Sequence, residues 1–200
     1  MIDEPVTLAA ALHGTLRARG QAEAFVAPGE RHTWAAMQRQ ALRVARALQA
    51  SGVRRGDHVG IMLGNGGQWV HIFYACAHVG AVAVPINTRF KAEELRFCLA
   101  QADVRLLFMA DRFLGIDFLE LLQQVEPAVA TRLPGAQLPE LREVVVLSEA
   151  DAAAASGTAP AALASPAGTV GYANFLARGQ SVAQHELDAV AARVSPHDVL

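Results

Sequence analysis

The stretch 52–87 constrains the fold of this chain most strongly, because it reads as one strand–helix–strand unit. An apolar run over residues 59–63 lacks polar alternation, which is typical of a strand covered on both faces. An amphipathic segment over residues 69–79 predicts a helix, and Gly80 suits the left-handed position that ends one. The second apolar run, 81–85, closes with a proline that cannot donate to a ladder. This pattern predicts two parallel strands joined by a right-handed crossover.

The turn between that strand and helix is rich in glycine, reading Gly64, Asn65, Gly66 and Gly67. Backbone amides at the start of a helix can bind an anion. A dinucleotide fingerprint would place its third glycine at position 69, which is Trp69, and a phosphate loop would need Gly-Lys-Ser/Thr. The preferred interpretation is therefore a tight turn in which Asn65 caps the following helix.

Helical and strand patterns alternate on both sides of this unit. They predict helices over residues 7–19, 33–50, 91–102, 113–125 and 172–177, another from about residue 184, and further strands over 24–27, 104–109 and 143–147. A loop is expected over 127–139. The predicted fold class is α/β, with a mostly parallel sheet and helices on both of its faces.

Composition excludes several classes of protein. A hydrophobic fraction of 52% with 18% charged residues predicts a folded, well-cored chain, and a net charge of −2 provides no basic field for nucleic acid. Both cysteines, Cys76 and Cys98, fall in predicted helices, so a disulfide framework is not expected and a reducing cytoplasm fits better. No signal peptide is expected at the start, and no apolar run is long enough for a transmembrane segment.

None of the polar side chains forms a convincing catalytic or metal-binding pattern. The chain has seven histidines, of which His71 and His78 lie two turns apart on one predicted helix, whereas metal pairs on a helix usually stand four residues apart. Glu93 and Glu94 fall in the first turn of a helix, where carboxylates complement the dipole. Residues 54–55 are two arginines, interpreted as a solvated loop. No catalytic, cofactor-binding or metal-ligating residue is therefore assigned.

Several short blocks follow one another in a familiar order. Residues 32–48 contain His-Thr-Trp and end in Ala-Leu spaced by two residues, and 52–59 read Gly-Val-Arg-Arg-Gly-Asp-His-Val. Further along come Asn65, Trp69, Gly80, Ala81, Pro85 and Asn87. The set resembles the amino-terminal part of the adenylate-forming enzymes, an AMP-binding superfamily of acyl- and aryl-CoA synthetases, luciferases and peptide-synthetase domains. The resemblance covers most of 30–125 and extends more weakly over 172–200.

The resemblance implies part of the large amino-terminal domain of an AMP-forming acyl-CoA synthetase. Such an acid–CoA ligase activates a carboxylic acid with ATP and Mg²⁺ as an acyl adenylate and transfers the acyl group to CoA. Residues 85–90 and 113–147 resemble fatty-acyl-CoA synthetases more than peptide-synthetase domains, which favours a fatty acid. On this basis residues 1–200 are an incomplete AMP-binding domain. Its core is 30–148, residues 149–169 form a flexible Ala/Ser/Pro/Gly-rich segment, and 170–200 lead up to a missing phosphate-binding loop.

The family's catalytic groups have no counterpart in this sequence. These are the glycine-rich phosphate loop, a magnesium-binding acid, a ribose-binding aspartate and a carboxy-terminal lysine, whereas the one lysine here, Lys91, opens an unrelated helix. The 200-residue chain is therefore expected to be inactive, with no cofactor identifiable within it. The alternative is a complete, non-catalytic α/β binding or regulatory module. The acid, the acceptor thiol (CoA or a carrier protein) and the oligomeric state remain open.

Overall fold

The computed structural model describes residues 5–27, 29–148 and 167–200. It divides into two compact units. The first consists of Met1–Asp57, Asn65–Val82 and Leu176–Leu200, and the second of His58–Gly64 and Ala83–Phe175. The segment expected to be flexible, 149–169, lies almost entirely outside the described residues.

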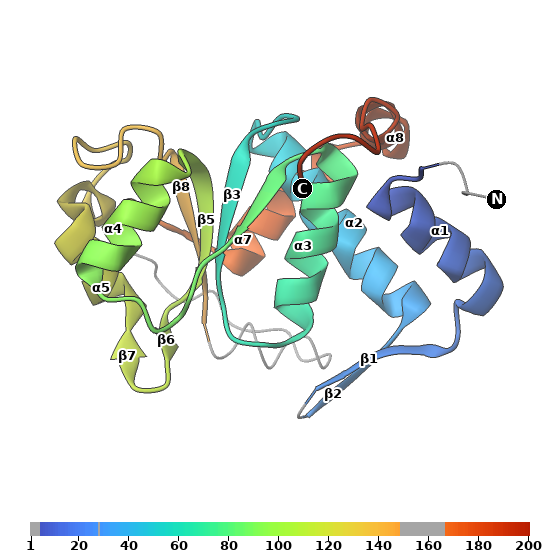
Figure 1. The fold of residues 1–200 in the computed structure, drawn as a ribbon, viewed down its shortest axis with the longest axis horizontal. Helices are drawn as coiled ribbons and strands as arrows, with labels where there is room; N and C mark the ends of the chain where they lie inside the picture. Colours follow the sequence, from blue (N-terminus) through green and yellow to red (C-terminus); the bar gives the residue numbers. More distant parts are fainter. Residues whose placement is uncertain (1–4, 28, 149–166) are drawn as a thin grey trace. The chain divides into compact units, whose positions relative to one another are not determined.

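A five-stranded sheet forms the centre of the second unit. Its strands are β3 (His58–Met62), β4 (Val82–Pro85), β5 (Val104–Ala110), β8 (Glu143–Leu147) and β9 (Val170–Gly171), in the order β4-β3-β5-β8-β9. Figure 1 shows β3, β5 and β8 side by side, and the pairs β3–β5, β5–β8 and β8–β9 are parallel. Backbone bonds from Val82 to Asp57 and from Ile86 to Ile61 advance together along β4 and β3, as parallel strands require. The predicted strand–helix–strand unit is thus confirmed.

Helices cover both faces of this sheet. The second unit contains α4 (Ala92–Gln101) and α5 (Phe118–Val125) and the first turn of α7 (Tyr172–Arg178). Leu107 and Met109 of β5 belong to one core cluster with the inward residues of α4 and α5. Phe108, between them, points to the opposite face, where its ring centroid lies 5.2 Å from that of Phe175 and 6.4 Å from that of Tyr172. The predicted fold class is therefore confirmed.

The segment between β5 and β8 differs from the prediction at two places. The helix expected from residue 113 begins only at Phe118, because a small hairpin, β6 (Arg112–Phe113) and β7 (Ile116–Asp117), precedes it. Leu114 and Gly115 form its turn with φ of 50° and 79°, which a right-handed helix cannot contain. The expected loop over 127–139 also contains a short 3₁₀ helix, η1 (Pro127–Ala130).

The first unit is built around two helices that pack along each other, α2 (Trp34–Ala50) and α3 (Gly67–Val79) (Figure 1). Around them lie α1 (Leu8–Arg19), the hairpin β1 (Glu23–Ala27) and β2 (Glu30–Thr33), η2 (Gly179–Ser181) and α8 (Gln184–Ala191). Thr33 caps α2 as its position suggests, with its hydroxyl oxygen 3.2 Å from the amide nitrogen of Ala36. Gly80 ends α3 with φ of 73°. Strand β2 was not predicted, because its residues are polar and do not alternate.

No helix among residues 5–27, 29–148 and 167–200 combines the length and the apolar character needed to cross a bilayer.

Candidate functional site

Two buried histidines and a carboxylate of the first unit meet at the amino terminus of α3. The helix follows the glycine-rich turn and starts at Gly67, with Gly66 in the N-cap position. The amide of Gly67 donates to Glu30 Oε1 at 2.7 Å, and Glu30 Oε2 lies 2.9 Å from His32 Nε2. The prediction that Asn65 caps this helix is therefore wrong: its side chain is exposed, and a carboxylate from the hairpin takes that place.

Two histidines enclose this carboxylate on its buried side. The rings of His32 and His71 meet edge to face, with centroids 5.2 Å apart, and the two residues are 7% and 4% exposed. Burial foremost, and then the nearby His32, lower the pKa of His71 to about 4, although Glu30 opposes the change. His71 is consequently neutral at neutral pH, and its Nε2 has no hydrogen-bond partner among the residues that the structure describes. We call Glu30, His32 and His71 the α3 cluster.

The α3 cluster leaves no space for a side chain at Gly67, the last glycine of the turn. A Cβ at Gly67 would lie 2.8 Å from His32 Nε2 and 2.9 Å from Glu30 Oε2. The backbone amide thus does meet an anion, but one that belongs to the same chain. A nucleotide phosphate would have to displace Glu30 and would face two imidazoles, one of which is held neutral. The α3 cluster does not fit a phosphate group and acts as a structural cap.

A second polar contact joins segments far apart in the sequence. Arg55 Nε donates to Asp198 Oδ2 at 2.6 Å, and its Nη2 donates to Oδ1. Asp198 Oδ2 also accepts from the amide of Ser195 at 2.9 Å. These bonds, those from Arg55 foremost, lower the pKa of Asp198 to about 2, so the carboxylate stays ionised. Both Arg54 and Arg55 are exposed, in agreement with their interpretation as a solvated loop, and Arg55 also binds a carboxylate of the same chain.

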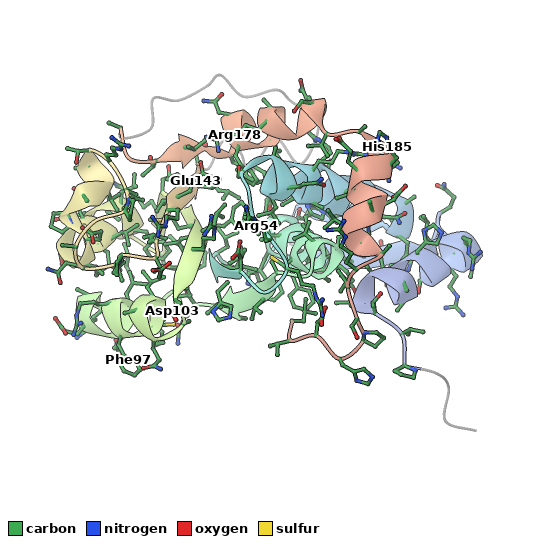
Figure 2. All side chains as sticks on the ribbon, turned by 90° about the horizontal axis from the view of Figure 1, so that it is seen from above. Arg54, Phe97, Asp103, Glu143, Arg178 and His185 are labelled. Carbon is green, nitrogen blue, oxygen red and sulfur yellow. The ribbon has the colours of Figure 1, made fainter. Side chains whose placement is uncertain are left out.

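An open pocket of about 590 Å³ lies on α4 in the second unit. It is lined by Phe90, Glu93, Glu94, Phe97, Cys98, Gln101 and Ala102. Phe97 is 65% exposed and points away from the sheet (Figure 2). Glu94 accepts from the amide of Lys91 at 2.9 Å and Glu93 pairs with Arg96, so the structural interpretation of both carboxylates is confirmed.

The other residues singled out from the sequence are placed without a common site. His78 lies on α3 with His71, and burial lowers its pKa as well. Cys76 and Cys98 are free thiols. Within the three described ranges, no group of three or more His, Cys, Asp or Glu side chains could hold a metal ion.

Comparison with known proteins places the chain in a family. The family model described as AMP-binding enzyme matches residues 12–199. The chain is 36% identical over 203 residues to the 3-[(3aS,4S,7aS)-7a-methyl-1,5-dioxo-octahydro-1H-inden-4-yl]propanoyl:CoA ligase of Mycobacterium tuberculosis, a match that covers 100% of the chain and 34% of that protein. It is 39% identical over 110 residues to the acyl-CoA ligase sidI of Aspergillus fumigatus, covering 54% of the chain and 19% of the relative.

Solved structures of CoA ligases and synthetases share the fold of this chain. The fatty acyl CoA synthetase of Mycobacterium tuberculosis superposes with a TM-score of 0.62 at 23% identity, over 88% of the chain and 28% of that structure. The anthranilate CoA ligase AuaEII superposes with a TM-score of 0.61 at 28% identity, over 70% of the chain and 25% of that structure. The chain thus spans at most 34% of the length of these curated relatives. It belongs to the AMP-binding enzyme family.

Proposed function

We propose that this chain is the amino-terminal part of an acid–CoA ligase. The observation that carries the proposal is the match to a CoA ligase along the whole chain, at 36% identity. A second relative, the long-chain-fatty-acid–CoA ligase FadD13 of Mycobacterium tuberculosis, is 42% identical over 82 residues and supports a fatty acid as the substrate. In the proposed reaction the acid's carboxylate attacks the α-phosphorus of ATP, pyrophosphate leaves, and the thiol of CoA then displaces AMP. Mg²⁺ would offset charge on the phosphates.

The proposal assigns a structural role to this chain and the chemistry to residues outside it. In this proposal the core 30–148 supplies four of the five strands of the sheet, and residues 170–200 add the fifth and lead into the phosphate-binding loop. The polar groups described above are already engaged internally: Glu30 with Gly67, Asp198 with Arg55, and Glu94 with Lys91. The 200-residue chain is accordingly proposed to form no acyl adenylate, and cytoplasmic location is proposed for the whole protein.

The test compares this chain with a version extended to the length of its relatives. Both are assayed for ATP–pyrophosphate exchange with a panel of fatty and aromatic acids, beside a blank without acid, and the extended protein is then assayed for thioester formation with CoA. We expect acid-dependent exchange from the extended protein alone. Exchange by the 200-residue chain would show that the active site lies within residues 1–200. An extended protein inactive with every acid would refute the ligase proposal.

A further inference from the structure

The turn near residue 198 is held by a contact across the sequence. Arg55 and Asp198 stand 143 residues apart, yet two nitrogens of the guanidinium donate to the two carboxylate oxygens. This two-pronged geometry fixes direction as well as distance, which a single ammonium could not do. The side chain of Asp198 is only 17% exposed, although that of Arg55 is 53% exposed.

The same carboxylate closes the turn in which it lies. The amide of Ser195 donates to Asp198 Oδ2 at 2.9 Å, and the amide of Asp198 donates back to the carbonyl oxygen of Ser195 at 3.0 Å. The amide of His197 donates to Ser195 Oγ at 3.2 Å. Residues 195–198 are thus a closed turn, and Arg55 orients this turn through its carboxylate.

Arg55 is itself held against the end of α3. A Cβ built at Gly80 would lie 3.1 Å from Arg55 Cγ and 3.0 Å from Val194 Cγ2, so the arginine stem and Val194 both pack on this glycine. The amide of Gly56 donates to the carbonyl oxygen of Gly80 at 2.8 Å. Helix α8, which precedes Val194, packs against α2 and α3. The turn is therefore attached beside the end of α3 at both of its ends, through Val194 and through the bond from Arg55 to Asp198.

We infer that Arg55 and Asp198 are positioning residues, which set the direction in which the chain continues past residue 200 and hence the placement of the phosphate-binding loop. The inference rests on the proposed function, which puts that loop there. Neither side chain is proposed to touch the nucleotide. Displacement of a catalytic element by about 1 Å can lower a rate about 100-fold, so loss of the pair is expected to affect use of ATP more than use of the acid.

The experiment uses Arg55→Met and Asp198→Asn, with Arg55→Lys as the conservative variant. Arg54→Met is the matched control, because the Arg54 side chain is exposed and forms no hydrogen bond or ion pair with the described residues. In the 200-residue chain, amide hydrogen exchange at Ser195 and Asp198 is measured. In the extended protein, ATP–pyrophosphate exchange gives KM for ATP, KM for the acid and the maximal rate.

We expect Arg55→Met and Asp198→Asn to speed amide exchange in the turn at least about tenfold, and to lower the maximal rate divided by KM for ATP by a similar factor. KM for the acid should not change. The amide exchange rates and kinetic constants of Arg55→Lys should lie between those of the wild type and Arg55→Met, and those of Arg54→Met should match the wild type. Unchanged amide exchange would show that the pair does not hold the turn. Faster amide exchange with wild-type kinetic constants would show that the pair affects only the local turn. That result would overturn the inference but not the proposed function. An extended wild type without acid-dependent activity would refute the proposed function and this inference together.

Discussion

The carboxylate of Glu30 is expected to hold the β1–β2 hairpin against α3, so Glu30→Ala should destabilise the first unit. The substitution removes the acceptor of the Gly67 amide and the partner of His32 Nε2, at 2.7 and 2.9 Å. Loss of a helix cap costs about 1 kcal/mol. Leaving a buried polar nitrogen without a partner costs about 1–3 kcal/mol, and His32 is only 7% exposed.

Together these losses predict a decrease of about 2–3 kcal/mol in the free energy of unfolding, near the lower end of their sum, because water can reach the site of the 18% exposed Glu30 side chain. Glu30→Gln keeps an oxygen for the Gly67 amide and should cost about 1 kcal/mol. Asn65→Ala, the matched control in the same turn, should stay within about 0.5 kcal/mol of wild type because the Asn65 side chain is exposed.

The assay is urea unfolding followed by tryptophan fluorescence. Both tryptophans, Trp34 and Trp69, lie in the first unit, so the signal reports on the unit that is perturbed. A Glu30→Ala transition that overlays the wild-type curve would refute the assignment of the cap. A larger loss from Asn65→Ala than from Glu30→Ala would restore the cap that the sequence suggests.

Three further outcomes are expected. Because the pKa of His71 is lowered from 6.5 to about 4, the unfolded chain takes up a proton there first, so the free energy of unfolding should fall by about 3 kcal/mol as pH drops from 6.5 to 4. In urea unfolding at several pH values, His71→Met should lack this pH-dependent loss. The same pH dependence in the wild type and the variant would contradict the prediction. Glu126, which is 2% exposed, accepts from the amides of Ala128, Gln137 and Leu138. Glu126→Ala should therefore lower the free energy of unfolding by about 3 kcal/mol or more, measured by circular dichroism melts. A loss below about 1 kcal/mol would argue against this hydrogen-bond network. Cys98 should react with a thiol reagent in the folded chain and Cys76 only after unfolding, because Cys76 is fully buried and burial raises its pKa to about 12. Equal reaction rates of the two thiols in the folded chain would show that α3 opens readily.

Local sequence patterns were sufficient to predict structure wherever a residue's conformation depends on its neighbours in sequence. The apolar run 59–63 became a central strand, and Gly80 ends α3 in the left-handed conformation because only glycine adopts it without strain. Thr33 caps α2, since a hydroxyl needs only the amide three residues on. The family membership was also accessible from the sequence, because motif order and spacing are properties of the chain itself.

Elements that exist only through pairing could not be predicted in this way. Strand β9 is two residues long and forms only beside β8. Strand β2 has a polar sequence, and pairing with β1 is what makes it a strand. The helix expected from residue 113 was interrupted by a turn at Leu114, a residue that rarely takes a positive φ. In each case the partner strand or turn geometry overrode the local preference.

The polar contacts depended entirely on tertiary structure. Glu30 lies 37 residues from Gly67, so no periodicity connects this carboxylate to the helix that it caps, and the nearer Asn65 was the reasonable candidate. Arg55 and Asp198 are separated by 143 residues. The sequence by itself determined the α/β order of elements and the AMP-binding family, because both are encoded in short-range patterns. Only the tertiary structure decided which carboxylate meets which donor, because those distances depend on how the helices and hairpin pack.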